Sequence, residues 1–377
     1  MSQDISEFVT ASGELLGFGE PTHLEPCFGQ VRNELVFQLA GLGFRSVALE
    51  TDRVAALRVD AFVRQGVGSL DEAMAGGFSH GFGEVAANRE LVSWLRDYNA
   101  ARPADQQLAF HGFDASLETM SAPSPRPYLD HAREYLQLDL DLAPLVGADD
   151  QWSRTEAVID PASSIGATPA ADSLRVIADD LLIALYARAP ELIAATSRDE
   201  WQQSETYLTA ALGILRYHKE CARVEADQGL RIARLSSLRD ALMAQNLLAV
   251  RALETRRGPT FVFAHNTHLQ RNQNTWQFGD TDVTLASAGA ILSTLLDDRY
   301  TFVAGSLGRS RTIGLEEPAP GTYESHLQRS TPTSWSLTPA AATPEGTTRT
   351  DPTPQQGYFP LTAATIKGAD AILHLSD

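Results

Sequence analysis

The stretch LLGFGEPTH, residues 15–23, decides how the chain begins to fold, because a short apolar run ends in glycine and is followed at once by polar residues. Such a run is typical of a buried β-strand. The segment 28–40 has apolar residues at helical spacing, and a second apolar run, 46–49, follows it and ends at Glu50. Strand, helix and strand in this order predict parallel strands joined by a helical crossover.

The same alternation extends to both sides of a long helical region, 126–255. Before it and after it the pattern predicts helices at 54–63, 84–98 and 286–296 and strands at 108–110, 260–264, 302–304 and 371–375. The stretch 331–360 is rich in threonine and proline and predicts a surface excursion or a mobile loop.

The expected fold class is α/β, with a parallel-rich central sheet, flanking helices and a large helical insertion covering a deep cleft. One domain spans 1–377. Residues 1–125 and 256–377 form its α/β core, and 126–255 form the insertion, a lid. Ligands of such sheets lie outside the carboxyl ends of the strands. The polar residues that directly follow strands are therefore the candidates for a site.

The composition limits the partners. The chain has 48 acidic and 30 basic residues, and its formal net charge of −18 disfavours nucleic acid as a partner. No apolar run approaches the roughly 18 residues of a membrane span. The polar, acidic start lacks the features of a signal peptide, and two cysteines make no disulfide framework. We expect a cytoplasmic monomer or homodimer that acts on a small molecule and binds no membrane.

Glu20 and His23 form the first candidate pair. They lie three residues apart in a turn after the first strand, where a carboxylate can orient an imidazole whose ordinary pKa is near 6.5. Such a pair can serve as a general base, although a glutamate and a histidine near a turn are more often solvated or capping groups. Glu50 ends a buried strand, where a carboxylate without a partner is costly. Its alternative is to cap the helix near residue 54, which Asp52 could also do.

HNTH, residues 265–268, is the third candidate group and follows the apolar strand FVFA. His265 and His268 could face one pocket, and Asn266 between them is a candidate for substrate binding. A structural polar turn is the plainer interpretation. Sets of histidine and glutamate also hold zinc, so a divalent metal at this cluster stays open, but no ligand signature requires one and no cofactor is predicted.

Three further residues complete the predicted site. Arg32 lies on the first helix, where it could neutralise a carboxylate or hold an oxyanion; an exposed salt bridge is its alternative. His111 and Asp114 follow the third predicted strand and are candidates for substrate binding. A serine nucleophile of the GxSxG kind is not expected, because that motif is missing and GSLG at 305–308 does not supply it.

In order and spacing these segments resemble the erythromycin esterase family. The resemblance rests on GFGEPTH, the helix with Arg32, the strand ending at Glu50 and AHNTH, with support from NRELVSWLRDYN (88–99), FHGFD (110–114), PGTYESHL (320–327) and ADAILHL (369–375). It implies an α/β core with a helical part over a deep cleft. In the resistance members it implies hydrolysis that opens the macrolactone ring of macrolide antibiotics.

The resemblance also implies roles for the residues. His23 would be the general base on water, and Glu20, Glu50, Arg32, His265 and His268 would complete the catalytic site. Leu24 stands where family members often have glycine, and the prolines of 121–127 and the helical segment after them differ from the resistance enzymes. These departures leave the expected fold and catalytic residues unchanged but weigh against a macrolide as the substrate.

The prediction is therefore metal-independent hydrolysis of an ester or lactone, with antibiotic resistance or natural-product biosynthesis as the setting. A lyase or epimerase using the same residues, and a non-catalytic small-molecule-binding protein, are the alternatives. Both enzymatic hypotheses, the hydrolase and the lyase or epimerase, require His23 to lie within roughly a dozen ångströms of His265 and His268. This is the largest distance that one bridging ligand could span.

Overall fold

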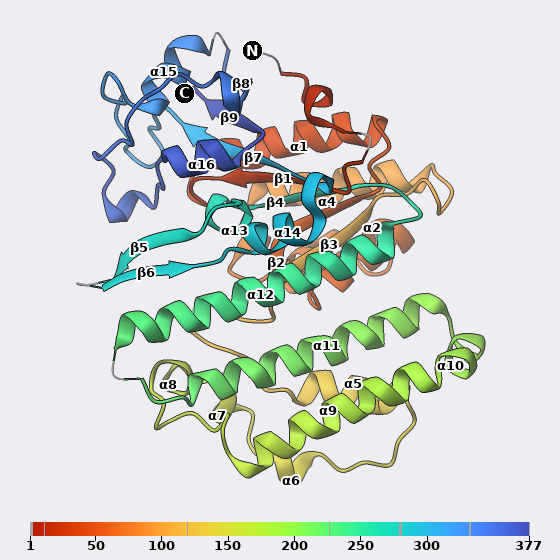
Figure 1. Cartoon of the computed structure of the whole chain (residues 1–377). Coiled ribbons are helices and arrows are strands. Elements are labelled where there is room, and N and C mark those ends of the chain that lie inside the picture. Colours follow the sequence, from red (N-terminus) through yellow and green to blue (C-terminus); the bar gives the residue numbers. More distant parts are fainter. Residues whose placement is uncertain are drawn as a thin grey trace.

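The computed structural model describes residues 3–10, 12–118, 120–225, 227–278, 281–331 and 333–376. Its centre is a seven-stranded sheet in the order β3-β2-β4-β1-β7-β9-β8 (Figure 1). The strands are β1 (Leu15–Glu20), β2 (Ser46–Asp52), β3 (Ala109–Asp114), β4 (Thr260–His265), β7 (Tyr300–Leu307), β8 (Trp335–Pro339) and β9 (Ala371–Leu375). All neighbours are parallel except β8, which runs antiparallel to β9.

Strands from the two ends of the chain are interleaved at the centre of this sheet. β1 lies between β4 and β7, and β4 lies between β1 and β2. Because the strands are parallel, their carboxyl ends meet at one edge, and Glu20 at the end of β1 is the register partner of His265 at the end of β4. Residues 245 positions apart in the sequence are thus neighbours at that edge.

Helices cover both faces of the sheet. On one face lie α1 (Pro26–Gly41), α2 (Ala56–Gln65), α3 (Leu70–Gly76) and α4 (Ala86–Ala100), and their apolar residues join a core cluster with β1, β2 and β4. Phe28 and Leu35 of α1 are fully buried there, and each such side chain stabilises the fold by about 1.5–3 kcal/mol. The opposite face packs against α12 (Gln228–Glu254), α13 (Asn266–Leu269) and α14 (Ala288–Leu296), in a second cluster.

A separate layer of helices lies below α12 in Figure 1. It consists of α5 (Arg126–Tyr135), α6 (Ala143–Val146), α7 (Asp150–Ser153), α8 (Thr155–Ile159), α9 (Pro169–Ala187), α10 (Ala189–Ala195) and α11 (Arg198–Cys221). All of these helices except α8 contribute to a hydrophobic core of their own. The long helix α12 lies between this layer and the sheet, contacting α11 on one side and β3 and α14 on the other.

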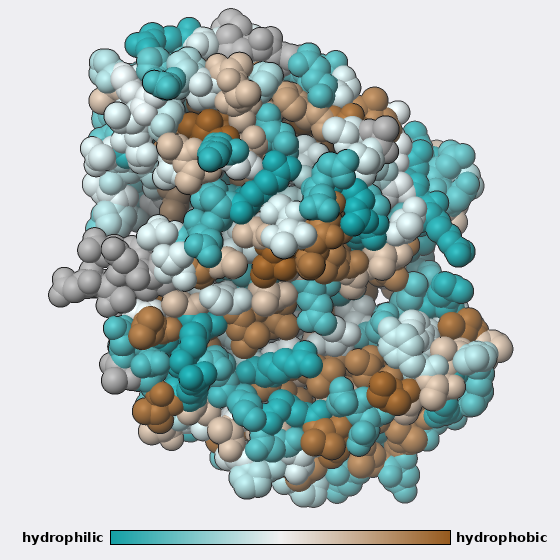
Figure 2. Space-filling model, viewed as in Figure 1, coloured by the Kyte–Doolittle hydropathy of each residue, from teal (hydrophilic) through white to brown (hydrophobic). Residues whose placement is uncertain are grey.

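The surface in the same view is mostly hydrophilic, with small hydrophobic patches on both parts (Figure 2). A hollow separates the two parts beside the carboxyl end of α12. There, the ends of α11, α12 and α2 line a cavity of about 1100 Å³. Of the helices among the described residues, none is both long enough and apolar enough to cross a bilayer.

The predicted strand at 108–110 was too short, because β3 runs on through Asp114 and includes His111. Gly112 permits this extension. A Cβ at Gly112 would lie 2.5 Å from the backbone oxygens of Thr51 and Asp52, so only glycine lets β3 pack this closely against β2.

The prediction of a surface excursion or mobile loop over 331–360 was wrong in part, since β8 lies inside it and pairs with β9. Trp335 and Leu337 on alternate positions of β8 are buried in the core, which gives this edge strand its register. A hairpin that the pattern missed, β5 (Asn274–Phe278) with β6 (Thr281–Leu285), lies beside α12. The remaining helices are α15 (Tyr323–Ser330) and α16 (Ala363–Gly368).

Candidate active site

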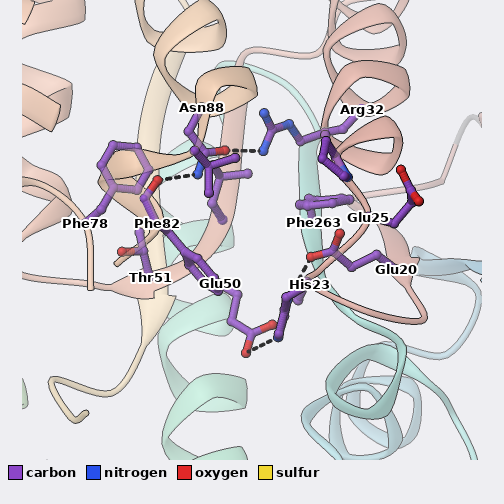
Figure 3. Close-up of a pocket in the computed structure, with 15 residues that line it drawn as sticks. Glu20, His23, Glu25, Arg32, Glu50, Thr51, Phe78, Phe82, Asn88 and Phe263 are labelled. Atoms are coloured by element: carbon purple, nitrogen blue, oxygen red, sulfur yellow. Dashed lines mark hydrogen bonds and ion pairs between the residues drawn. The ribbon is translucent and has the colours of Figure 1, made fainter. Parts of the chain in front are cut away.

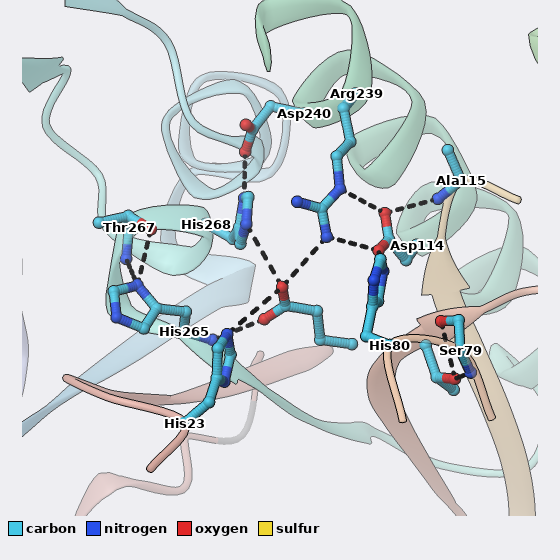
Figure 4. Close-up of polar contacts among 12 residues, drawn as sticks. His23, Ser79, His80, Asp114, Ala115, Arg239, Asp240, His265, Thr267 and His268 are labelled. Atoms are coloured by element: carbon cyan, nitrogen blue, oxygen red, sulfur yellow. Dashed lines mark hydrogen bonds and ion pairs between the residues drawn. The ribbon is translucent and has the colours of Figure 1, made fainter. Parts of the chain in front are cut away.

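Polar side chains converge where the carboxyl ends of β1, β2, β3 and β4 meet α12 (Figure 4). We call this set the cluster; its members are Glu20, His23, Glu50, Asp114, Arg239, Asp240, His265 and His268. The rings of His23 and His265 have centroids 5.2 Å apart, well within the predicted limit. Glycine at position 19 is needed for this approach, since a Cβ there would overlap the Asn266 side chain at the start of α13.

His23 is held by Glu20, whose Oε1 lies 2.8 Å from His23 Nδ1. Nδ1 therefore carries a proton, and Nε2 is directed to Glu50 Oε1 at 3.9 Å. The ring packs against Phe82 on one side, and the side chain is 35% exposed. Burial disfavours the charged imidazole, but the carboxylates of Glu50 and Glu20 outweigh it and raise the pKa of His23 to about 9. Burial raises the pKa of Glu20.

Glu50 is the centre of the cluster. Its Oε1 lies 3.3 Å from Arg239 Nη2 and 3.4 Å from His268 Nε2, and its Oε2 accepts the backbone N–H of His265 at 2.8 Å. Burial alone would raise the pKa of this carboxyl, but the positive charges of His268, His23 and Arg239 lower it to about 2. Glu50 is therefore ionised at neutral pH.

His268 is fixed by a carboxylate from α12. Its Nδ1 lies 2.9 Å from Asp240 Oδ1, which also accepts the backbone N–H of Ala288 at 2.9 Å. This contact leaves Nε2 directed at Glu50. Although burial opposes the charge, Glu50 and Asp240 raise the pKa of His268, which favours the protonated form that can donate a proton.

His265 differs from the other two histidines. Its Nδ1 lies 2.7 Å from Thr267 Oγ1 and accepts the backbone N–H of Thr267 at 3.2 Å. Burial, together with the nearby positive charge of His23, lowers the pKa of His265 to about 3, so this ring is neutral. Its place beside His23 and against Phe359 suits packing and orientation better than proton transfer.

Arg32 lies at the far side of a small cavity that begins at Glu20, His23 and Glu50 (Figure 3). Its guanidinium is buried and bonds to neutral groups: Asn88 Oδ1 at 2.6 Å, Asn33 Oδ1 at 2.8 and 3.0 Å, and Ala87 O at 3.0 Å. Phe263 packs under it, 5.1 Å from ring centroid to Cζ. Burial lowers the pKa of Arg32 to about 10, so it remains a cation at neutral pH.

Two side chains of the cluster, Arg239 and Asp240, were not predicted from the sequence. His80, which was not predicted either, lies next to the cluster. Arg239 binds Asp114 at two points, Nε to Oδ1 at 2.9 Å and Nη2 to Oδ2 at 2.6 Å. His80 Nε2 lies 2.9 Å from Asp114 Oδ2. Asp114 is fully buried, yet Arg239 and His80 hold its pKa well below the usual range.

The remaining predicted residues have other surroundings. Asn266 donates Nδ2–H to Gly305 O at 2.8 Å and accepts Gly305 N–H at 3.0 Å, which ties the end of β4 to β7. His111 bonds Glu254 at 2.9 Å and lines the cavity at the other end of α12. Neither contacts the cluster's side chains among the described residues, and a role in substrate binding stays a prediction for both.

The cluster thus offers an imidazole whose Nε2 is directed at Glu50 beside the cavity, a second imidazole whose raised pKa favours its protonated form, a guanidinium and two ionised carboxylates within contact of one another. These are the parts of a general acid–base site. No group of three or more His, Cys, Asp or Glu residues within the described ranges has the geometry of a metal site. Ser306 of the GSLG stretch is fully buried against His374, with Oγ 3.0 Å from Nδ1.

Comparisons with known proteins agree with this architecture. Solved structures with the same fold are a Bacillus cereus protein (16% identity over 97% of this chain and 89% of that one, TM-score 0.71) and a mutant of the erythromycin esterase EreC in its open conformation (18%, 98% and 93%, TM-score 0.67). A third is a succinoglycan biosynthesis protein (16%, 97% and 88%, TM-score 0.62). At these identities the likeness shows the fold. No curated protein matches the sequence.

The family comparison is more specific. The model of the erythromycin esterase family matches residues 40–374, a range that includes Glu50, Asp114, Arg239, His265 and His268. Glu20, His23 and Arg32 precede the matched range but are joined to it by the contacts above. Because the match covers most of the chain, it shows what the resemblance of the motifs implied: the chain belongs to the erythromycin esterase family.

Proposed function

We propose that this protein hydrolyses an ester or lactone by direct attack of water, with His23 as the general base. Membership of a family of esterases supports the reaction class. The observation that carries the assignment is the pair of contacts on His23. Glu20 fixes Nδ1 at 2.8 Å, and Nε2 is directed to Glu50 Oε1 at 3.9 Å, beside a cavity that both residues line. A base so oriented can take a proton from a water molecule placed against the substrate.

In this reaction His23 Nε2 takes one proton of the water while the oxygen forms a bond to the carbonyl carbon. The tetrahedral intermediate collapses, its carbon–oxygen bond to the leaving group breaks, and a protonated histidine gives the alkoxide its proton. His268 is suited to that donation because Glu50 and Asp240 raise its pKa. Water and ester are converted to acid and alcohol, and no covalent intermediate forms on the protein.

We propose that the reaction needs no metal. A histidine must lose its proton to bind a metal ion, whereas the carboxylates around His23 and His268 raise the pKa of both. The expected result is hydrolysis that persists after treatment with a chelator and that added divalent cations do not increase. Loss of activity with the chelator, restored by a metal, would overturn this part.

A macrolactone is the substrate class that we propose to test first. The experiment is a screen of macrolactones and small esters, with and without chelator, in water enriched in oxygen-18 and read by mass spectrometry. Hydrolysis places one labelled oxygen in the carboxylate product. A product that forms without label would show elimination or epimerisation at the same site and would refute the hydrolase.

A further inference from the structure

Arg239 is held by acids on two of its three nitrogens. Nε and Nη2 bind Asp114 at 2.9 and 2.6 Å, and Nη2 also lies 3.3 Å from Glu50 Oε1. This two-point contact fixes the plane of the guanidinium. Nη1 bonds to none of the described residues and, in Figure 4, points toward the space beside His268. The side chain is 26% exposed, so a ligand can reach it.

The position of Arg239 places this donor next to the groups of the proposed mechanism. Arg239 Nη2, His268 Nε2 and His23 Nε2 all lie within 4 Å of one atom, Glu50 Oε1. Donors that stabilise an oxyanion must lie about 3 Å from the oxygen while the base stands near the carbonyl carbon. A carbonyl group in front of Glu50 would meet both conditions.

Arg32, the arginine predicted from the sequence, is less suited to this task. It is buried, and its nitrogens bond Asn33, Asn88 and Ala87, all neutral groups within the protein. These contacts hold Arg32 at the inner end of the cavity, where its charge acts on Glu20 through space.

We infer that Arg239 is a catalytic residue whose Nη1 binds the carbonyl oxygen of the substrate and stabilises the negative charge formed there; this rests on the hydrolysis proposed above. When water attacks, the π electrons of the carbonyl move onto its oxygen, which becomes an oxyanion facing Nη1. When the intermediate collapses, these electrons re-form the carbonyl bond and the alkoxide leaves with a proton. A guanidinium already oriented by Asp114 stabilises the oxyanion without reorganising.

The test compares Arg239→Lys with Arg234→Lys. Arg234 lies on the same helix but pairs with Glu220 and Glu225, away from the cluster. A lysine at 239 keeps the charge, but its single ammonium would be drawn to Asp114 and Glu50 and would leave the carbonyl without a donor. The probe substrate is p-nitrophenyl butyrate. The mono-p-nitrophenyl ester of propylphosphonic acid mimics the tetrahedral oxyanion, and N-(4-nitrophenyl)butyramide mimics the uncharged ground state.

We expect Arg239→Lys to lower kcat by about 10²–10³-fold with little change in KM, and to weaken phosphonate binding, measured by calorimetry, by a similar factor. Anilide binding should change less than about twofold, since the guanidinium stabilises the charged oxyanion far more than the neutral carbonyl oxygen of the ground state. Arg234→Lys should match the wild type in every measurement. A kcat within about threefold of the wild type for Arg239→Lys, or an equal loss of phosphonate and anilide binding, would overturn the inference.

Failure of the proposed function gives a different result. If the wild type hydrolyses neither this ester nor a lactone, the hydrolase proposal fails, yet phosphonate binding still tests Arg239. Phosphonate binding that is lost only in Arg239→Lys supports an oxyanion site. The inference is overturned if Arg239→Lys binds the phosphonate as tightly as the wild type does, or if the wild type shows no detectable binding. If Arg239→Lys does not fold, the double variant Arg239→Gln/Asp114→Asn replaces it. This variant removes both charges of the buried ion pair, and the same results are expected from it.

Discussion

Replacing Glu20 with glutamine should shift the pH dependence of hydrolysis downward. Glu20 Oε1 lies 2.8 Å from His23 Nδ1, and glutamine can still accept that hydrogen bond through its amide oxygen. The substitution therefore removes a negative charge but keeps the orientation of the ring. With less negative charge nearby, the imidazolium form of His23 is stabilised less and its pKa falls.

The size of the shift follows from the geometry. A charge pair at about 4 Å is worth about 1 kcal/mol in water and about 4 kcal/mol near a protein surface, and one pKa unit corresponds to 1.36 kcal/mol. Because His23 is 35% exposed, solvent screening favours the lower half of that range. We expect the pKa of His23 to fall from about 9 by about 1–2 units.

The sign has a measurable consequence. The base must be neutral, and kcat/KM reports the free enzyme, so with p-nitrophenyl butyrate, whose leaving group needs no proton, the wild-type kcat/KM should rise about tenfold per pH unit below 9 and level off above it. At pH 7 roughly one wild-type molecule in a hundred has a neutral His23. In Glu20→Gln the plateau should begin at lower pH but reach a lower rate, because a weaker base takes the proton less readily.

The assay is a pH profile of kcat/KM, combined with an NMR titration of the histidine ring protons. The His23 signal is assigned by its loss in His23→Gln. Glu34→Gln is the matched control, since Glu34 lies on the exposed side of α1 and bonds only Trp335 among the described residues. A midpoint that stays in place in Glu20→Gln, or that moves upward, would refute the reasoning about charge.

Three other substitutions test separate contacts. His23→Ala should abolish turnover while the melting temperature stays close to that of the wild type; full activity would remove His23 as the base. Asp240→Asn should lower the pKa of His268, because it removes a carboxylate 2.9 Å from Nδ1, and should slow esters with poor leaving groups more than p-nitrophenyl esters. Equal slowing of both would contradict an acid role. Gly305→Ala should cost about 1–3 kcal/mol of unfolding free energy, measured with urea, because its Cβ would press on the Gly19 carbonyl and lie 3.1 Å from Glu20 Cα; an unchanged stability would contradict the tight packing of β1 against β7.

The sequence predicted the strands that form the centre of the sheet, because these strands are continuous apolar runs buried on both faces. It missed the outer parts of the sheet for the same physical reason. β8 is an edge strand in which Ser336 and Thr338 alternate with Trp335 and Leu337, and the end of β3 contains His111 and Asp114. A mixed strand of this kind gives no apolar run, and only its neighbours in the fold show that it pairs.

The candidate site divides along a similar line. Glu20, Glu50, His265 and His268 could be predicted because each stands at or just after a buried strand, and a parallel sheet brings such residues to one edge. Arg239 and Asp240 could not, because a charged pair in a long helix usually faces solvent. Only the packing of α12 against β3 brings them to Asp114 and His268, more than 25 residues away in the sequence in either direction.

The charges of the cluster explain why its histidines differ and what the site gains from this. Glu20, Glu50, Asp114 and Asp240 bring four carboxylates, and the fixed positive charges that oppose them among the described residues are Arg239 and the more distant Arg32. Protons on His23 and His268 supply the missing charge, so the pKa of each is raised, whereas His265 bonds Thr267 and has a pKa of about 3.

The same imbalance drives the proposed reaction. When His23 is neutral, the cluster lacks one positive charge, and taking a proton from water restores it. The oxyanion that forms at the same moment faces the guanidinium of Arg239, so the attack creates opposite charges at places already arranged for them. The site therefore has few active molecules at neutral pH but a strong base in each. Lowering the pKa of His23 by Glu20→Gln should give more active molecules at neutral pH but a weaker base in each. A base outside this cluster would show no such exchange.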